Sequence, residues 1–219
     1  MKYRIRAIAT LAYAFSAVAL GAAAGPDISK VNGSVRLEAG QVAGDVSTVN
    51  GSVTVGTDAT ADEVETVNGS MQIAERAKVR SAETVNGAIG IGAGAVVAEG
   101  VSAVNGSMTL GQGTQVGGRL ENVNGKMRLE GAQVSGGIKT VNGDIYLAAN
   151  SRVSGGIHYE QNHSWWKNST SSRNPRLSIE QGVVIEGPLH FEREVDVYLA
   201  PGVTLPEVTG TPPKRYTLE

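Results

Sequence analysis

The sequence predicts an all-β protein, a single-stranded parallel β-helix in which short strands stack coil upon coil. The tripeptide Val-Asn-Gly occurs seven times at steps of 18 or 19 residues, and each copy is followed by an alternating apolar pair. A fixed period of this length is typical of a solenoid, in which each repeat is one structural unit that stacks on the next. The 29 glycines and the low aromatic content, 5%, agree with a narrow core of small branched side chains.

Each apolar pair lies two and four residues after the glycine, which predicts a short strand with one buried face. In four periods a second apolar pair precedes the next repeat, so a coil is expected to carry two or three strands. The first pairs are Val35 and Leu37, Val53 and Val55, Met71 and Ile73, Ile89 and Ile91, Met108 and Leu110, Met127 and Leu129, and Ile145 and Leu147. The second pairs are Val97 and Val101, Val116 and Leu120, Val134 and Ile138, and Val153 and Ile157.

Val-Asn-Gly itself is predicted to form a tight corner. Its valine is expected to point inward, while its asparagine tolerates left-handed geometry and its glycine supplies a positive φ. One asparagine in every coil further predicts a ladder of amide hydrogen bonds along the rod. The members of this predicted ladder are Asn32, Asn50, Asn68, Asn86, Asn105, Asn124 and Asn142.

Two later segments, 177–189 and 197–205, repeat the inward spacing without Val-Asn-Gly. We therefore expect about nine coils of 18–19 residues within residues 25–208. Residues 209–219, which include two prolines, are expected to form a flexible C-terminal tail.

A loop insertion is predicted at about residues 161–174. Two inward positions that are 7 residues apart at Leu120 and Met127 are 20 residues apart at Ile157 and Leu177. The additional residues must leave the rod between these two coils.

Residues 1–24 have the pattern of a signal peptide. Basic residues at positions 2, 4 and 6 precede an apolar stretch over 7–20, and three alanines at 22–24 offer a cleavage site before Gly25. A retained membrane anchor is the alternative, but the alanine-rich stretch favours cleavage, after which no transmembrane segment is expected. The protein should therefore be exported and be periplasmic, secreted or at the cell surface.

The remaining chain has 16 Lys and Arg against 21 Asp and Glu, a net charge of −5. Because these charges are scattered, we expect no nucleic-acid partner. There is no cysteine, which excludes a lipid-anchored lipoprotein and a disulfide framework.

The recurring pattern T-V-N-G-S-[VM]-x-[VIL], present at Thr48–Val55 and Thr66–Ile73, resembles the adhesin-like family of bacterial envelope β-helices. Later coils, such as Gln133–Ile138, are also similar to bactofilins, the polymer-forming cytoskeletal β-helices. The resemblance covers roughly residues 28–208 and implies a right-handed helix without defined catalytic residues. The signal peptide departs from bactofilins, which are mostly cytoplasmic or membrane-associated, and favours the envelope.

A left-handed hexapeptide-type β-helix is the alternative fold. Its coils also have about 18 residues, and Val31, Leu37, Ala43 and Val49 fall at six-residue intervals. Against it, the partner positions two residues earlier hold bulky side chains, Met71, Met108 and Met127, where that fold prefers small ones.

We expect no enzyme, no catalytic residue, no metal site and no cofactor. The three histidines are spaced too irregularly for metal ligands and are expected on the surface. No surface position is expected to repeat an acid, as a polysaccharide lyase or hydrolase would need. Asp58, Asp62 and Glu63 are interpreted as solubilising turn residues.

The insertion holds both tryptophans of the chain and is the best candidate for binding. Adjacent aromatics beside basic residues can stack on sugar rings or enter a partner's groove; the alternative is that the loop covers apolar surface of the rod. The candidate binding residues are Tyr159, His163, Trp165, Trp166, Lys167 and Arg173.

The leading functional hypothesis is a non-enzymatic structural or adhesin-like rod of the cell envelope, with an envelope glycan or protein as partner. A carbohydrate-binding or carbohydrate-active protein that uses the tryptophan loop is one alternative. A polymer-forming scaffold that self-associates through the ends of the β-helix is another, because open ends present unpaired strand edges.

Overall fold

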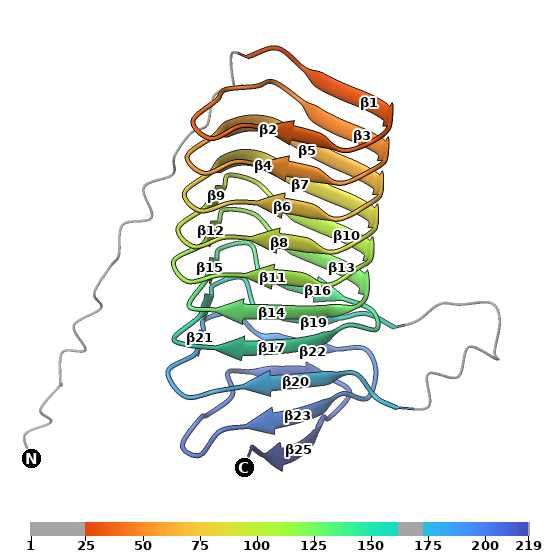
Figure 1. Ribbon diagram of the computed structural model, residues 1–219. Helices are drawn as coiled ribbons and strands as arrows, with labels where there is room; N and C mark the ends of the chain where they lie inside the picture. Colours follow the sequence, from red (N-terminus) through yellow and green to blue (C-terminus); the bar gives the residue numbers. More distant parts are fainter. Residues whose placement is uncertain (1–24, 162–172, 219) are drawn as a thin grey trace, which may run out of the picture.

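The computed structural model describes residues 25–161 and 173–218 and confirms the predicted parallel β-solenoid (Figure 1). All described strand pairs in its two sheets are parallel, and the described residues contain no helix. One of the two sheets has ten strands and takes one strand from each coil, so the solenoid has about ten coils rather than the predicted nine. The right-handed winding stays a prediction.

The first sheet has ten strands, one from each coil, and runs down one side of the rod (Figure 1). Each strand pairs with its counterpart in the next coil, so that Val53 lies opposite Met71 and Val55 opposite Ile73. The strands are β2 (Val35–Leu37), β4 (Val53–Val55), β6 (Met71–Ile73), β8 (Ile89–Ile91), β11 (Met108–Leu110), β14 (Lys126–Glu130), β17 (Asp144–Ala148), β20 (Arg176–Ile179), β23 (Asp196–Leu199) and β25 (Lys214–Thr217).

The second sheet has fifteen strands and forms the other walls of the coil. One column comprises β1 (Ile28–Asn32), β3 (Val46–Asn50), β5 (Thr60–Asn68), β7 (Lys78–Asn86), β10 (Val101–Asn105), β13 (Leu120–Asn124), β16 (Ile138–Thr140), β19 (Ile157–Tyr159), β22 (Leu189–Phe191) and β24 (Val208–Gly210). A shorter column comprises β9 (Val96–Val97), β12 (Gln115–Val116), β15 (Gln133–Val134), β18 (Arg152–Val153) and β21 (Val184–Ile185). Strand β7 joins the two columns, because it pairs with β9 through its first residues and with β10 through its last.

The core is a continuous column of aliphatic side chains inside the coils. All eleven apolar pairs predicted to point inward are buried, from Val35 and Leu37 to Val153 and Ile157. Aromatic side chains join the core in the C-terminal coils, where Tyr159 and Phe191 are fully buried. Stacking of coils therefore buries faces that no single short strand can bury alone.

The Val-Asn-Gly valines do not point inward, which corrects the prediction. Val49 and Val67 are each 40% exposed, while the preceding Thr48 and Thr66 are buried. The threonine suits the inward position because its hydroxyl has a partner there: Thr48 Oγ1 donates to the carbonyl oxygen of Gly33 at 2.9 Å. The corner then turns with valine and asparagine both outside.

Backbone conformation does not explain the corner either. None of the ladder asparagines has a positive φ, and among the Val-Asn-Gly glycines only Gly33 and Gly125 do. The other glycines are required by close approach of the coils: a Cβ on Gly87 would lie 1.9 Å from the carbonyl oxygen of Gly69.

The predicted asparagine ladder is present. In each of six steps, Nδ2 of one asparagine donates to Oδ1 of the asparagine one coil earlier, at 2.9–3.1 Å. The ladder ends at Asn142, whose Oδ1 accepts a hydrogen bond from Arg193 Nη1 at 2.6 Å. Arg193 thus satisfies the last acceptor at the point where the motif stops.

The predicted end of the solenoid at residue 208 is too early. Strands β24 and β25 pair with β22 and β23 and carry the solenoid to Thr217. Tyr216 stacks on Tyr198 with ring centroids 4.8 Å apart, and Lys214 Nζ lies 3.2 Å from Glu194 Oε2. Residues 209–217 therefore form part of the last coils rather than a tail.

Candidate functional site

The insertion leaves the solenoid after β19 and returns before β20. Residues 162–172 lie outside the described residues, but both ends of the insertion are described. At the first end, the backbone N–H of Gln161 donates to Glu192 Oε2 at 3.0 Å. At the second, the guanidinium of Arg173 contacts both carboxylate oxygens of Asp144, at 3.1 and 2.8 Å. Side chains of the neighbouring coils therefore fix both ends.

Asp144 is the more enclosed partner of that ion pair, with 19% of its side chain exposed against 53% for Arg173. Burial alone would raise the pKa of the Asp144 carboxyl, but hydrogen bonds from Arg173 and from the backbone N–H of Arg176 hold that pKa below its ordinary value. The carboxylate is therefore ionised at neutral pH.

The predicted binding residues fall into three groups: those outside the described residues, an exposed arginine and a buried tyrosine. His163, Trp165, Trp166 and Lys167 lie outside the described residues. Arg173 is exposed, as predicted, but is engaged with Asp144.

Tyr159 is not a surface binding residue, which corrects the prediction. Its ring is fully buried and packs against Phe191 at 5.7 Å between centroids, and its hydroxyl donates to the carbonyl oxygen of Arg176 at 3.1 Å. Burial raises the pKa of the phenol well above its ordinary value. Tyr159 is instead part of the core at the end of β19.

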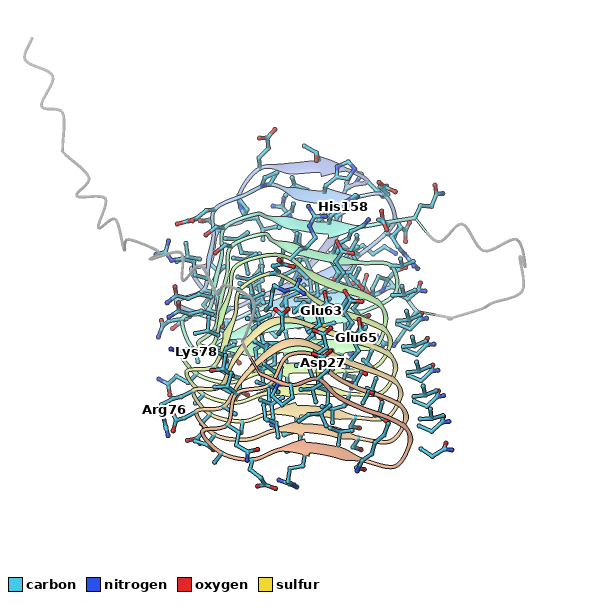
Figure 2. The ribbon with its side chains drawn as sticks, turned by 90° about the horizontal axis from the view of Figure 1, so that it is seen from above. Asp27, Glu63, Glu65, Arg76, Lys78 and His158 are labelled. Atoms are coloured by element: carbon cyan, nitrogen blue, oxygen red, sulfur yellow. The ribbon has the colours of Figure 1, made fainter. Side chains whose placement is uncertain are left out.

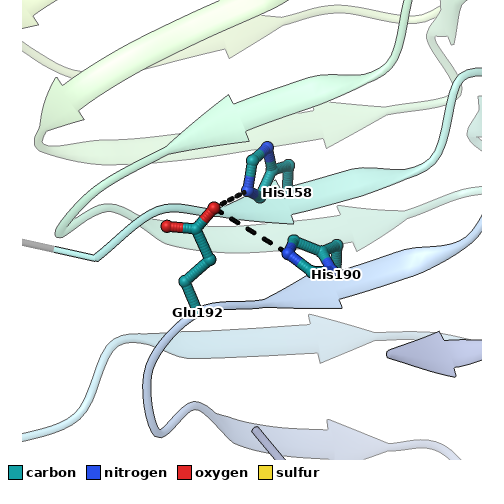
Figure 3. A group of neighbouring side chains, drawn as sticks. All are labelled: His158, His190 and Glu192. Carbon is teal, nitrogen blue, oxygen red and sulfur yellow. Dashed lines mark hydrogen bonds and ion pairs between the residues drawn. The ribbon is translucent and has the colours of Figure 1, made fainter. Parts of the chain in front are cut away.

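Two histidines and one glutamate meet beside the first end of the insertion (Figure 3). His158 on β19 and His190 on β22 are register partners in adjacent coils, with ring centroids 4.8 Å apart. Glu192 Oε1 lies 2.9 Å from His158 Nε2 and 3.8 Å from His190 Nε2. The irregular spacing of the histidines along the chain, which predicted no metal ligands, therefore does not keep these two apart in the fold.

Neighbouring groups orient two members of this cluster. His190 Nδ1 lies 2.8 Å from Thr209 Oγ1 on β24, so the opposite ring nitrogen faces Glu192. Glu192 Oε2 accepts from Gln161, which leaves Oε1 facing the histidines. The hydrogen bonds from Gln161 and His158 lower the pKa of the Glu192 carboxyl below its ordinary value.

A shallow depression adjoins the two histidines on the outer face of the sheet and includes Arg119 and Lys139. Lys139 precedes His158 by one coil in register, and its ammonium pairs with Glu160 at 2.8 Å. Arg119 pairs with Glu121 at 3.2 Å. Both cations beside the histidines are therefore balanced by carboxylates.

Acidic side chains gather further along the same sheet, around Arg80. Its guanidinium contacts Asp62, Glu63 and Glu99, at 2.5, 2.6 and 3.3 Å. Arg80 thus joins three coils, and Asp62 and Glu63 lie in strand β5 rather than in a turn, which corrects their interpretation as turn residues. Asp58 does lie in a turn and pairs with Arg76 of the next coil at 2.8 Å.

The prediction that no surface position repeats an acid is also wrong. Glu65 and Glu83 are register partners on adjacent coils, and Glu63 and Glu65 share the face of the rod that carries His158 (Figure 2). Partial burial and the neighbouring carboxylates raise the pKa of Glu65. The guanidinium of Arg80 is already paired with three other carboxylates, those of Asp62, Glu63 and Glu99.

No protein-family model matches the chain, and no curated protein or solved structure matches it either. Among residues 25–161 and 173–218 there is no helix long and apolar enough to span a membrane. The resemblances to adhesin-like β-helices and to bactofilins therefore stay predictions.

Proposed function

We propose that this chain is an exported, non-enzymatic β-solenoid that serves as a rigid binding rod of the bacterial cell envelope. The observation that carries the proposal is the set of side-chain links between coils. The asparagine ladder connects seven coils, and the ion pairs of Arg76, Arg80 and Arg173 each join residues of different coils. A chain of such links along a continuous core resists bending and opening of single coils.

The binding part of the proposal concerns the insertion. Its two ends are held by Glu192 and Asp144, so a rigid scaffold fixes where the loop leaves and re-enters the rod. Binding residues are commonly placed on loops that a rigid scaffold positions. With Trp165 and Trp166 in this segment, the partner we propose is an envelope glycan, whose sugar rings stack on aromatic side chains.

A pull-down with isolated cell walls and a glycan array tests the binding proposal. We expect the wild-type chain to bind and the double variant Trp165→Ala/Trp166→Ala to lose most of that binding. Tyr216→Ala is the matched control, because it removes a 43% exposed aromatic from the last coil, away from the insertion. Equal binding by the wild type and the double variant would refute the insertion as the binding segment.

Export has its own test. Residues 1–24 motivate the expectation that the chain is cleaved before Gly25. Fractionation of cells that express the chain, followed by mass spectrometry of its N-terminus, should recover a chain beginning at Gly25 outside the cytoplasm. An uncleaved chain in the cytoplasm would contradict the proposal.

Self-association through the ends is the second candidate. Within the described strands, β1 pairs only with β3 and β25 only with β23, so each end strand has one free edge. Free edges of parallel sheets can pair with another copy. Filaments in negative-stain micrographs would support a polymer, whereas a constant monomer mass by light scattering would exclude it.

A further inference from the structure

We propose that His158, His190 and Glu192 form a binding site for a transition-metal cation such as Zn²⁺. The proposal does not depend on the function proposed above, because it uses only the geometry of the outer face of β19 and β22.

The donor set selects the class of cation. Two imidazole nitrogens and one carboxylate oxygen suit Zn²⁺ and related transition metals, whereas Ca²⁺ and Mg²⁺ prefer oxygen donors alone. Three protein ligands leave one tetrahedral position of a zinc ion for water. The side chains of His158 and His190 are 36% and 44% exposed, so solvent can reach that position.

The distances between donor atoms suit one shared ion. In a tetrahedral zinc site, with ligands at 2.0–2.1 Å, neighbouring donor atoms are about 3.3 Å apart. Glu192 Oε1 lies at 2.9 and 3.8 Å from the two Nε2 atoms, values on either side of that separation. All three donor atoms lie within 4.8 Å of one another. Small side-chain rotations therefore suffice to bring them onto one ion.

Thr209 acts as a positioning residue for His190. The hydroxyl of Thr209 faces both His190 Nδ1, at 2.8 Å, and the carbonyl oxygen of Leu189, at 3.5 Å. When the hydroxyl donates to the carbonyl, it accepts from Nδ1–H, and the lone pair of His190 Nε2 then faces Glu192. Metal-binding histidines commonly have such a partner on the second ring nitrogen.

The charges around the site permit a cation. The two carboxylate oxygens of Glu192 contact Gln161 N–H and His158 Nε2, and the ammonium of Lys139, one coil earlier, is paired with Glu160. The proton between His158 Nε2 and Glu192 Oε1 occupies the position that the metal would take. On binding, the single proton of the neutral His158 imidazole moves from Nε2 to Nδ1, so that the lone pair of Nε2 can bind the metal.

Isothermal titration with ZnCl₂ tests the site in the chain purified from expression of the full sequence. Purification uses a streptavidin-binding peptide, because a polyhistidine tag would itself bind zinc. We expect one Zn²⁺ per chain, a higher melting temperature with zinc, and weaker binding as the pH is lowered, because protons compete with the metal for the donor atoms.

Single variants assign the ligands. His158→Ala, His190→Ala and Glu192→Gln should each weaken zinc binding at least about tenfold, and Thr209→Val should weaken it by about 10- to 100-fold. A thermal melt without metal shows whether each variant is folded. His163→Ala is the matched control, because it removes the remaining histidine of the chain, which belongs to the insertion.

Two results would overturn the proposal. One is the absence of zinc binding by the folded wild-type chain at millimolar ZnCl₂. The other is wild-type binding by folded His158→Ala and His190→Ala variants, which would place any bound zinc elsewhere. Loss of binding in His163→Ala would also contradict the assignment.

Discussion

Along each strand that leads into a corner, side chains alternate between the core and the solvent until the chain turns. Thr48 faces the core, and then Val49 and Asn50 both face solvent. The inward threonine donates to a carbonyl of the neighbouring turn, and the outward asparagine extends the ladder. Valine, the most regular apolar residue of the motif, therefore contributes little to the core.

Val79→Ala and Val85→Ala test this division within one strand. Val79 is fully buried and Val85 is 40% exposed. We expect Val79→Ala to lower the free energy of unfolding by about 2 kcal/mol, because it removes two buried methyl groups and leaves a cavity. Val85→Ala should change it by less than about 0.5 kcal/mol. Urea denaturation measures both, and equal losses would show that the corner valine is buried after all.

The inward pairs were predictable at this scale because alternation in a short strand has only two phases. The corner was not, since Thr48 and Val49 are both compatible with a strand and only the stacked neighbour decides which of them faces inward. Hydrophobicity alone predicts that the valine faces the core, whereas the hydrogen bond from Thr48 to the carbonyl oxygen of Gly33 favours the threonine there.

The backbones of adjacent coils approach each other so closely that some positions have room only for glycine. At Gly87 an added Cβ would meet backbone, 1.9 Å from the oxygen and 2.5 Å from the carbonyl carbon of Gly69. At Gly90, in the same coil, the nearest atoms would be the end of the flexible Gln72 side chain, with Oε1 at 2.4 Å. The two glycines therefore have different reasons to be present.

Gly87→Ala should destabilise the solenoid by about 3 kcal/mol, because two coils must separate locally to admit one methyl group. Gly90→Ala is the matched control and should cost less than about 1 kcal/mol, since Gln72 can rotate away. Thermal and urea denaturation of both variants measure the difference. A tolerated Gly87→Ala would show that the coils are not in such close contact.

The ion pair at the second end of the insertion predicts a pH dependence. The folded-state pKa of Asp144 lies below its ordinary value of 3.8, so its stabilisation is complete above that value and is lost as the pH falls through the folded-state pKa. Asp144→Asn should therefore cost about 1 kcal/mol at pH 7 and progressively less relative to wild type as the pH falls below 3.8.

Asp58→Asn is the control for that measurement. It removes the pair with Arg76, whose side chains are 55% and 58% exposed, and pairs so exposed contribute little to stability. Urea unfolding at pH 7 and at pH 3 gives the comparison. A loss in Asp144→Asn that is equal at both pH values would mean that the ion pair is not its cause.

The cluster of two histidines could have been found by alignment of the coils. Ile157 and Leu189 both occupy the inward position before a histidine, and their pairing in β19 and β22 brings His158 onto His190. Spacing along the chain hid this, because the insertion lengthens that one coil. Glu192 and Thr209 were not predictable from spacing, since their contacts with the histidines depend on side-chain orientation and on a tenth coil that the sequence did not suggest.

Across the whole molecule, each coil adds one strand to the first sheet, and each new strand pairs in register with the strand of the preceding coil. In the first sheet, Arg36 on β2 and Arg128 on β14 occupy equivalent outward positions five strand steps apart, and Tyr216 on β25 lies nine steps from Arg36. The insertion lies between Arg36 and Tyr216 in the chain, and Tyr216 lies in the final coil, so the distance between the two residues tests the entire rod.

The most direct measurement is the pair of distances between spin labels on these positions. Because the chain has no cysteine, Arg36→Cys/Arg128→Cys and Arg36→Cys/Tyr216→Cys place labels without further changes. At about 4.8 Å per parallel step, double electron–electron resonance should give roughly 24 Å and 43 Å between the labelled backbone positions. Distances that fail to grow in proportion to the number of coils would contradict a single continuous solenoid.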